Sequence, residues 1–530
     1  MALALVGPAV AAAPAAPRGD ALTRALAAGH LTAAQYALER ARSLFALRQV
    51  RARYGDVARP GPHAATPILR DLARRVEGLS GRERKIAEAI LARPSDRAGD
   101  RFGDGYVAGI RMYRSCTRIL CVFYVRRSAD APPLRDANGN HVPDQVDRTR
   151  KVMTHVWRTE VGSFGYRRPK SDRSSGRHHG GNPDGRLDVF LANVGAQGFY
   201  GYCSTDDPHS RPSSSYRYWD VSAYCVLDDD FSRRQFPVGA HGLAALKVTA
   251  AHEFFHAVQF AYDWQEDLWL MEGTAVWMED EVYNSINDNV QYLADSPISK
   301  TEFWHPLDYV ASVRAFQYGA WIFWRYLSEH YGRGIVRQVW RRADGSSRGP
   351  DDYSAQAVVN ALAARGLSLA DEYADFALAN LSVAGYRDGP LYQSKPYLGP
   401  TVENDVADGV WKTQTVYHLS ERYHAYVPGT PSATSQLQVD VNLAPLVTGP
   451  RARLVVSFVS GGPAAVYPIS LDANGDGSQT VPYGSGVVSS VVLVLTNAGV
   501  DYRCWRGTNY SCQGTPLDDA PYLFRATVNP

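Results

Sequence analysis

The sequence predicts an α+β protein of several domains, and two observations support that prediction. Helical periodicity fills residues 17–105 and 238–411, whereas short apolar runs typical of strands fill residues 106–237 and 412–530. The chain also has 530 residues, which at roughly 150 residues per domain is too long for one hydrophobic core. Helices and strands that occupy separate stretches of a long chain are typical of the α+β class.

The composition is that of a folded protein without a charged partner. Hydrophobic residues make up 45% and charged residues 21% of the chain, values close to globular averages, so wholesale disorder is excluded. Lysine and arginine total 56 against 54 for aspartate and glutamate, which leaves +2 and predicts no nucleic-acid partner. After the N-terminus no apolar run reaches the roughly 18 residues of a membrane helix, so no membrane span is predicted.

The N-terminus and the cysteines predict a secreted, extracellular protein. Residues 1–16, MALALVGPAVAAAPAA, are similar to the apolar part of a signal peptide, although the usual positive charge at its start is missing. Pairing between near neighbours costs the least chain entropy and predicts three disulfide bonds, with six reduced thiols as the alternative. The three pairs are Cys116 with Cys121, Cys203 with Cys225, and Cys504 with Cys512.

Residues 17–105 are expected to form a helical N-terminal unit. Thr32 and Gln35 make a capping box before one helical run, and Ser80 with Glu83 makes another. The segment has no cysteine and little that is typical of a catalytic site. It is therefore either an accessory unit or a pro-segment, and the sequence leaves both readings open.

The remaining three regions differ in their hydrophobic period. Residues 106–237 alternate between apolar runs and loops rich in Gly, Ser, Pro and Asp, which predicts a β-rich region. Residues 238–411 return to the helical period, and residues 412–530 alternate again, which predicts a β-sandwich of ordinary domain size. The strands expected in the first of these regions span 119–125, 186–194 and 223–229.

The motif HEFFH at 252–256 carries the clearest chemical signal. Four residues apart on a helix, His252 and His256 leave the same face within reach of one metal ion, and Glu253 lies beside them to hold a water. Catalytic zinc needs a third protein ligand and an open fourth position. Glu272, sixteen residues after His256 on a second helix-like segment, supplies that ligand.

These residues resemble a known family. The HEFFH motif and WLMEG at 269–273 resemble the gluzincin zinc metallopeptidases, and DLWLMEGTA is similar to the third-ligand helix of their aminopeptidase branch. The resemblance implies a zincin-like catalytic unit, with a β-rich half at 106–237 and a helical half at 238–411 that carries the zinc. Because no GAMEN-type segment is present and the ligand spacing is shorter, it implies an endopeptidase. The wider arrangement is similar to a group of secreted bacterial metalloproteases.

The remaining catalytic roles rest on chemistry and on that resemblance. Glu253 is expected to act as the general base. Gluzincins often place a tyrosine before a glycine on a later helix, which makes Tyr318 the candidate donor to the oxyanion; core packing is the alternative role for this residue, and His305 is a rival donor. The acidic run of Glu279, Asp280 and Glu281 could orient a ligand histidine or compete with Glu272 for the metal.

An acidic loop at 135–151 predicts a calcium site. Its oxygens stand at positions 1, 3, 5, 9 and 12 of an EF-type loop, but His141 replaces the usual glycine at position 6, so an Asx-rich turn is the alternative. A second acidic run at 471–478 is interpreted as a hairpin turn. The five candidate calcium ligands are Asp136, Asn138, Asn140, Asp144 and Asp147.

Taken together, these observations predict a secreted zinc endopeptidase whose substrate is a protein or peptide. The C-terminal sandwich is expected to bind a surface or a polysaccharide. Two other functions stay open: an adhesion or carbohydrate-binding protein with structural zinc, and a zinc hydrolase that cleaves a non-peptide bond. The presence of Glu253 argues against the first, because a structural zinc site has no use for a base.

Overall fold

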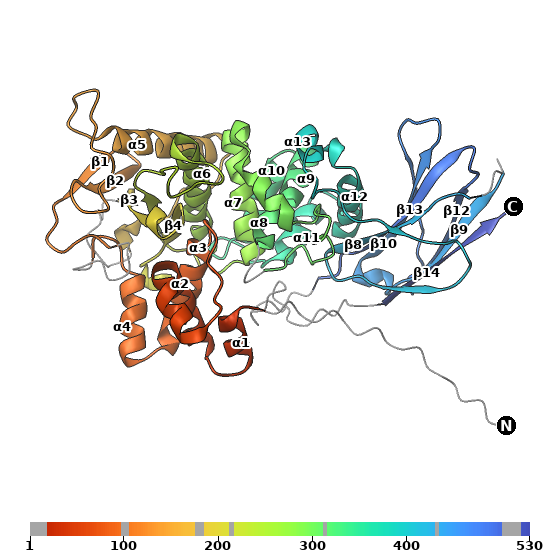
Figure 1. Ribbon diagram of the computed structural model, residues 1–530, viewed down its shortest axis with the longest axis horizontal. Coiled ribbons are helices and arrows are strands. Elements are labelled where there is room, and N and C mark those ends of the chain that lie inside the picture. The colour runs from red at the N-terminus through yellow and green to blue at the C-terminus, as the bar shows by residue number, and fades with distance from the viewer. Residues whose placement is uncertain are drawn as a thin grey trace.

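Three β-sheets and the helices between them make up the described part of the chain, so the protein belongs to the mixed α/β class. In the elongated computed structural model, the first sheet lies toward one end and the two C-terminal sheets lie at the other (Figure 1). The signal-like segment 1–16 falls outside the described residues. The structure describes residues 19–96, 105–174, 185–210, 217–310, 315–429, 434–500 and 521–530.

Four helices form the N-terminal unit. The predicted capping box at Thr32 and Gln35 is present, with each side chain accepting from the other residue's backbone N–H. The second predicted box is absent, because the Ser80 side chain makes no capping hydrogen bond to the helix that follows it. The helices are α1 (Ala21–Ala27), α2 (Ala33–Tyr54), α3 (Ala65–Arg75) and α4 (Gly81–Ile90).

The first sheet has five strands in the order β1-β2-β3-β5-β4. The pairs β2–β3 and β3–β5 are parallel and the other two pairs are antiparallel. Strands β2, β3, β4 and β5 are buried along their whole length, which matches the continuous apolar runs that a sheet covered on both faces requires. The strands are β1 (Met112–Cys116), β2 (Leu120–Val125), β3 (Leu187–Ala192), β4 (Gly201–Ser204) and β5 (Tyr224–Asp228).

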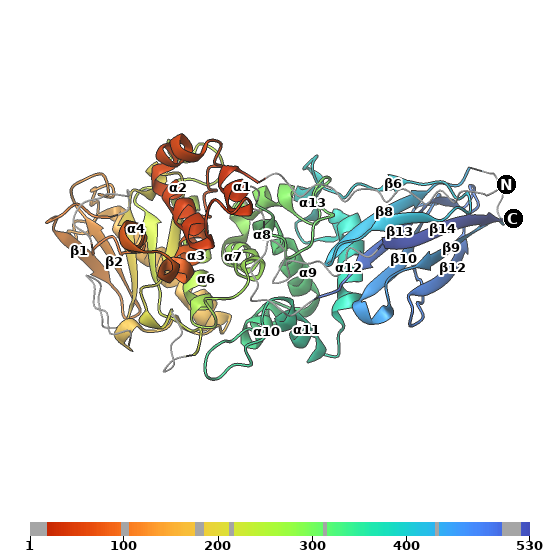
Figure 2. The same cartoon turned by 90° about the horizontal axis from the view of Figure 1, so that it is seen from below.

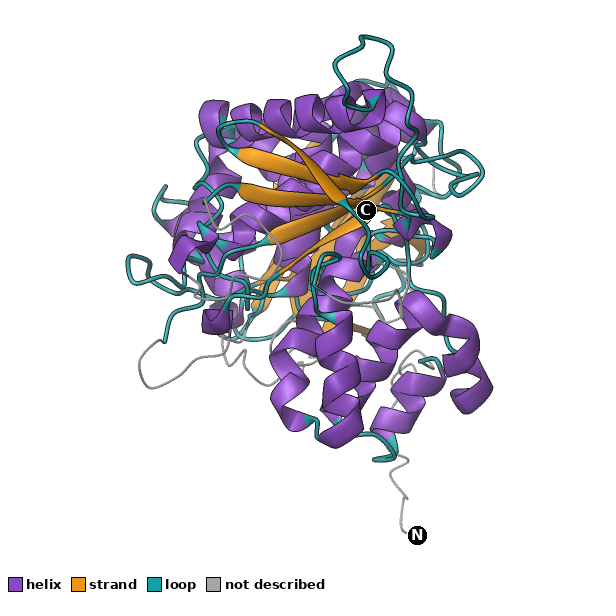
Figure 3. Cartoon of the chain, turned by 90° about the vertical axis from the view of Figure 1, so that its left-hand side faces the viewer, coloured by secondary structure: helices purple, strands orange, loops and turns teal. Residues whose placement is uncertain are grey.

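The N-terminal helices cover one face of this sheet and belong to its hydrophobic core. Phe123 and Phe190 share a cluster with Leu38 of α2 and Leu69 of α3. On the opposite face, the strands pack with α5 (Asp144–Trp157) and α6 (Gly242–Phe260). Figure 3 shows helices on both sides of the strands. The N-terminal unit is therefore an integral layer of the fold.

The helical body begins with two helices that are buried on nearly all sides. Helix α6 lies against β4 and β5 on one side and against α7 on another. Neither α6 nor α7 has a separate polar face, because apolar residues are spread around both helices, as expected for helices inside a core. The remaining elements are α7 (Leu268–Tyr283), the 3₁₀ segment η7 (Asp288–Asp295), α8 (Phe316–Gly319), α9 (Trp321–Tyr331), α10 (Gly334–Arg342), α11 (Ala355–Ala363), α12 (Leu369–Leu381) and α13 (Gly389–Gln393).

Two antiparallel sheets pack face to face at the C-terminal end. Their orders are β11-β10-β13-β8-β6, in which β6 pairs parallel with β8, and β12-β9-β14-β7. The outer face of the first of these sheets packs on α12, which joins the sandwich to the helical body (Figure 2). The strands are β6 (Glu403–Asn404), β7 (Lys412–Thr415), β8 (Ser420–Tyr426), β9 (Gln436–Asn442), β10 (Pro450–Phe458), β11 (Ala465–Pro468), β12 (Asp476–Pro482), β13 (Val488–Asn497) and β14 (Pro521–Asn529).

Two disulfide bonds staple neighbouring strands of the first sheet. Cys116 pairs with Cys121 across β1 and β2, and Cys203 pairs with Cys225 across β4 and β5, as the sequence predicts. The third predicted pair, Cys504 with Cys512, falls outside the described residues. Disulfide bonds are typical of proteins in oxidising compartments. None of the described helices has the length and hydropathy needed to cross a membrane.

Candidate metal centre

Three side chains from two adjacent helices meet at one point in the core. His252 and His256 project from α6, and Glu272 projects from α7. Their facing atoms form a triangle, with 3.1 Å between the two Nε2 atoms and 3.4 and 3.6 Å from these atoms to Glu272 Oε2. All three side chains are fully buried. The structure thus brings together the three residues that the sequence nominates as ligands.

The triangle has the dimensions of a tetrahedral metal site. Bonds of 2.0–2.1 Å to a tetrahedral ion place two ligand atoms about 3.3 Å apart, and the three separations here are 3.1, 3.4 and 3.6 Å. Two imidazoles and one carboxylate are also the donor set that leaves a position open in catalytic sites. Geometry and donor chemistry therefore both fit zinc.

Hydrogen bonds outside the triangle fix the tautomer of His256. Gln259 donates through Nε2 to Met271 O at 2.9 Å and to Thr274 Oγ1 at 3.1 Å, so its Oε1 must face His256 Nδ1 at 2.7 Å. Because an amide oxygen only accepts, Nδ1 carries the proton and Nε2 presents a lone pair to the triangle. Gln259 was not singled out by the sequence motif.

His252 is oriented in the same way by Glu279 on α7. Its Nδ1 lies 2.7 Å from Glu279 Oε1, which accepts the ring proton and leaves Nε2 directed at the triangle. Two nitrogen lone pairs and a carboxylate oxygen then face each other in a dry core. This arrangement is unfavourable unless a cation lies between them.

The pKa shifts agree with a site built around positive charge. Burial acts to raise the pKa of Glu272, but His256 and His252 outweigh it and lower that pKa to about 2. Burial acts to lower the pKa of His252, but hydrogen bonds to Glu272 and Glu279 outweigh it and raise that pKa to about 10. The carboxylate therefore stays ionised, and the site attracts a proton or a metal ion strongly.

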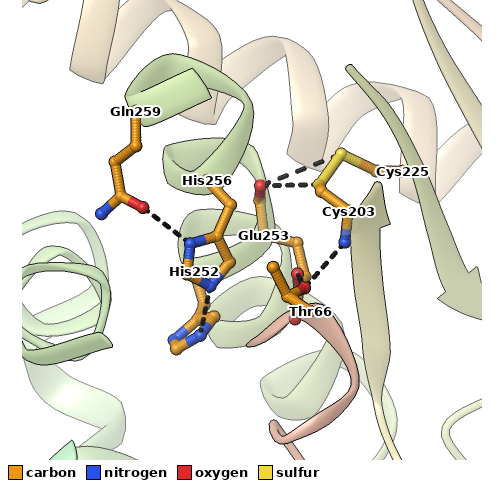
Figure 4. The surroundings of a disulfide bond; sticks show 7 residues. All are labelled: Thr66, Cys203, Cys225, His252, Glu253, His256 and Gln259. Carbon is orange, nitrogen blue, oxygen red and sulfur yellow. Dashed lines mark hydrogen bonds between the residues drawn. A yellow bond between two sulfur atoms is a disulfide. The ribbon is translucent and has the colours of Figure 1, made fainter. Parts of the chain in front are cut away.

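Glu253 lies on the same helix as the two histidines, one residue after the first of them. Its Oε2 accepts a hydrogen bond of 2.9 Å from Thr66 Oγ1, whereas its Oε1 is buried without a hydrogen-bond partner among the described residues (Figure 4). Burial raises its pKa, and the nearby His252 and His256 partly offset that rise. A carboxylate with a raised pKa beside a metal site can accept a proton and give it back.

Two residues of the N-terminal unit reach this site, and the sequence analysis missed both. Thr66 on α3 contacts Glu253, and His63 in the preceding turn lies with its ring centroid 4.8 Å from that of His252. Burial holds the pKa of His63 well below its usual range. No local signal could have identified either residue, because each is separated from its partner by more than 180 positions along the chain and belongs to no motif.

Tyr318 on α8 borders the site from the side of the helical body. Its ring is stacked on that of His252 with the centroids 6.4 Å apart, and it stacks on Tyr292 of η7 at 5.3 Å. The Tyr318 hydroxyl is buried without a hydrogen-bond partner among the described residues. Burial raises its pKa well above the usual value, and the charge of Glu272 adds to that rise, so the hydroxyl keeps its proton and is able to donate.

The rival residues have other partners. Asp280 pairs with Arg325 and Arg387, and Glu281 pairs with Arg325 at 3.0 Å, so both carboxylates turn away from the histidines. His305 lies 3.2 Å from Glu302 and stacks on Trp304 with the centroids 3.8 Å apart.

In the predicted calcium loop, the carboxylate side chains accept hydrogen bonds from other residues of the same loop. Asp136 accepts hydrogen bonds from the backbone N–H groups of Asn140 and His141, and Asp147 accepts from the side-chain amides of Asn138 and Asn140. Asp144, at the start of α5, accepts from the backbone of Ala137. His141 has φ +65°, so the position where calcium loops usually carry glycine adopts the left-handed conformation despite the substitution.

A further acidic cluster lies at the end of β5, formed by Asp228, Asp229 and Asp230. Asp228 accepts hydrogen bonds of 2.6 Å from the backbone N–H groups of Gly195 and Phe231. Burial raises the pKa of Asp228 to about 7 and that of Asp229 to about 8. Through these hydrogen bonds Asp228 stabilises the turn that follows β5.

Comparison with known proteins gives no family for this chain. No protein-family model matches it. No curated protein matches it either. Among solved structures, a family GH115 4-O-methyl-α-glucuronidase with specificity for decorated arabinogalactans aligns with a TM-score of 0.13 and 10% sequence identity, over 54% of this chain and 41% of that enzyme. A likeness this weak carries no argument about fold or function.

Proposed function

We propose that the protein is a zinc-dependent endopeptidase of the gluzincin type. The observation that carries this proposal is the triangle of His252, His256 and Glu272, with Glu253 beside it on the same helix. A purely structural zinc site is closed by four protein ligands and needs no base. The combination of three ligands with an adjacent buried carboxylate supports hydrolysis instead.

Residues of the chain would transfer the protons and stabilise the developing negative charge during peptide hydrolysis. Bound zinc supplies Lewis-acid chemistry, which acidifies water and polarises a carbonyl group. Glu253, through the unpartnered Oε1, takes a proton from the attacking water and passes it to the leaving amine. The Tyr318 hydroxyl, which has no other acceptor among the described residues, donates to the oxygen that gains negative charge.

We also propose that the loop at 135–151 binds calcium through Asp136, Asn138, Asn140, Asp144 and Asp147. The left-handed backbone at His141 supports this, because it gives the loop the turn that such sites need. The bound ion would stiffen the loop just before α5 and would take no part in the reaction. The C-terminal sandwich is proposed as a module that binds a surface or a polysaccharide.

The experiment that tests the peptidase is digestion of a mixed peptide library, analysed by mass spectrometry, before and after limited proteolysis of the protein. Wild type should cleave internal peptide bonds, and Glu253→Gln should not, although it keeps its zinc. Glu88→Gln on the surface of α4 is the matched control and should behave as wild type.

Two results would contradict the proposal. Loss of zinc in Glu253→Gln would mean that Glu253 is a ligand and not a base. Failure of every form to cleave peptides, with zinc bound, would favour the adhesion protein with structural zinc or the hydrolase of a non-peptide bond. A panel of esters and cell-wall amides would then separate these two.

A further inference from the structure

Two consecutive hydrogen bonds link Glu253, the general base of the proposed function, to the first sheet. The backbone N–H of Cys203 on β4 donates to Thr66 Oγ1 at 2.9 Å, and Thr66 Oγ1 donates to Glu253 Oε2 at 2.9 Å (Figure 4). The direction of both bonds is fixed, because an amide N–H only donates and an ionised carboxylate only accepts. The single proton of the Thr66 hydroxyl is therefore directed at Glu253.

The first of these bonds uses the outer edge of the sheet. Among the described strands, β4 is the last in the order β1-β2-β3-β5-β4, so it pairs with β5 on one side only. Helix α3 packs against β4, and there Thr66 accepts the N–H of Cys203. Because a buried N–H group needs an acceptor, the sheet holds the Thr66 hydroxyl in the orientation from which it reaches Glu253.

The backbone of Glu253 also contacts β4. The Sγ atom of Cys203, which forms the disulfide bond with Cys225, lies 2.8 Å from the backbone oxygen of Glu253. Because a disulfide sulfur has no proton to donate, this is a packing contact. It keeps β4 against the turn of α6 that carries Glu253.

The contact with Thr66 decides which oxygen of Glu253 is free to accept a proton. The last torsion of a glutamate side chain is broad and roughly twofold, so a carboxylate without a fixed partner can exchange its two oxygens. Thr66 binds Oε2, whereas Oε1 has no hydrogen-bond partner among the described residues. Oε1 is therefore the oxygen that remains for the attacking water.

Thr66 is held rigidly within α3. It is the second residue of that helix and is fully buried, and its branched side chain has few allowed rotamers. One turn later, Arg70 donates to the backbone oxygens of Trp264 and Glu266 in the connection between α6 and α7. Leu69 packs into the core that α3 shares with the first sheet. Helix α3 is thus fixed to the sheet and to the connection between the two helices that carry the candidate metal ligands.

We propose that Thr66 is a positioning residue that orients the general base, so that the N-terminal unit at 17–105 is a permanent part of the active site and not a removable pro-segment. This inference rests on the proposed function and adds to it a residue from a distant part of the chain. A blocking role for Thr66 does not fit its contacts, because the hydroxyl binds Oε2 of Glu253 and leaves Oε1 without a partner among the described residues.

Two substitutions at Thr66 test the positioning role in the full-length, zinc-loaded protein. Thr66→Val removes the hydroxyl and keeps the branched shape. We expect kcat for peptide hydrolysis to fall about 10- to 100-fold, part of the roughly 10²- to 10⁴-fold that a positioned proton acceptor contributes. KM and zinc content should stay close to those of wild type, because the hydroxyl acts on the base. Thr66→Ser, which restores a hydroxyl, should recover most of kcat.

Thr154→Val on α5 is the matched control, because the hydroxyl that it removes donates within its own helix, to the backbone oxygen of Arg150. It should behave as wild type. If Thr66→Val does not fold, Thr66→Ala removes the same hydroxyl with a smaller side chain, and the same fall in kcat is expected. An unchanged or increased kcat in a folded variant without the hydroxyl would overturn the inference. So would a fall that Thr66→Ser does not recover, because packing of the whole side chain would then explain it.

Intact-mass analysis of the purified, active protein tests the role of the N-terminal unit. We expect the active chain to retain the unit, which the structure describes at residues 19–96. An active chain that begins after residue 96 would overturn the inference. If wild type cleaves no peptide although zinc is bound, the proposed function and this inference fall together. If wild type is active and Thr66→Val matches it, the inference falls alone and the peptidase proposal stands.

Discussion

Each histidine of the candidate metal centre is held by an acceptor on the side of its ring that faces away from the metal. For His252 the acceptor is Glu279, and for His256 it is Gln259, whose amide is itself fixed by Met271 and Thr274. Such acceptors select the tautomer and orient the ring before a metal ion arrives. The affinity of the site therefore depends on residues that never touch the ion.

Gln259 provides the clearest test of this orientation. Replacing it with leucine keeps the volume but removes the acceptor, so His256 can turn or adopt the wrong tautomer. We expect zinc affinity to fall roughly 10- to 100-fold, the usual cost of losing an outer-shell partner, as measured by competition with a chelator. Gln338→Leu on α10 is the matched control, and unchanged affinity in Gln259→Leu would mean that Gln259 does not position the ring.

The sequence could predict the residues of this site that lie close together along the chain. His252, Glu253 and His256 occupy two turns of one helix, and Glu272 follows on the next, so a helical period and a short connection were enough to suggest that they meet. His63 could not be found in this way. Its position depends on how the N-terminal helices pack against the sheet, which no local pattern encodes.

At the scale of elements, the N-terminal unit is fixed by its packing and by one buried ion cluster. Arg93, just after α4, lies 2.5 Å from Asp188 on β3 and 2.8 Å from Asp206 after β4. The Arg93 side chain is 3% exposed, so its charge is almost entirely withdrawn from water. This cluster ties the helical layer to the sheet that it covers.

Breaking this cluster should destabilise the fold strongly. Arg93→Met leaves Asp188 and Asp206 without their cation in a dry environment, which typically costs about 3–5 kcal/mol in the free energy of unfolding. Denaturant unfolding followed by circular dichroism measures the change. Arg84→Met on the surface of α4 removes an exposed partner of Glu77 and Glu88 and should have little effect; equal stability of the two variants would argue against a buried anchor.

Calcium should stabilise the element that begins at α5. If the loop at 135–151 binds the ion, a calcium concentration 100 times the Kd adds about 2.7 kcal/mol to the free energy of unfolding, which raises the Tm in a thermal scan with calcium compared with EGTA. Asp136→Ala should abolish the rise. Asp472→Ala, in the acidic turn of the sandwich, should leave it intact, and a calcium effect that Asp136→Ala does not reduce would place the ion elsewhere.

Sequence patterns predict where strands and turns lie along the chain, but they do not predict which strands pair. Three strands of the first sheet, β2, β3 and β5, follow the ranges predicted for them at 119–125, 186–194 and 223–229 closely, because their apolar runs are continuous. The hairpin turn predicted at 471–478 is confirmed, because Leu471 and Gly477 form an antiparallel bridge across it. The strands on either side nevertheless find other partners: β11 pairs with β10, and β12 pairs with β9 in the other sheet. The turn residues are those of a hairpin, whereas the partner of each strand is decided by the sandwich.

At the scale of the whole molecule, the sandwich is joined to the helical body through a buried carboxyl group. Glu421 on β8 accepts hydrogen bonds from Tyr373 at 2.7 Å and from Asn380 at 3.1 Å, both on α12. Burial raises the pKa of Glu421 to about 7, although these hydrogen bonds partly offset the rise. The junction between the two parts of the chain therefore responds to pH within the physiological range.

The sign of this response follows from where the proton binds more tightly. Between the ordinary pKa of 4.5 and the folded value of about 7, the folded protein holds a proton on Glu421 that the unfolded chain has released. Stability from this group is therefore complete below pH 4.5 and is lost as the pH rises toward 7, by about 3 kcal/mol in total. Glu421→Gln keeps hydrogen bonds to both partners without a titrating proton, so it should lose less stability than wild type when urea unfolding at pH 5 and pH 8 is compared. The carboxyl groups of Asp228, Asp229 and Glu279 titrate in the same direction in wild type and in Glu421→Gln. The difference between the two proteins in the free energy of unfolding lost between pH 5 and pH 8 therefore isolates Glu421. An equal loss in both proteins would show that the Glu421 carboxyl group ionises freely in the folded state.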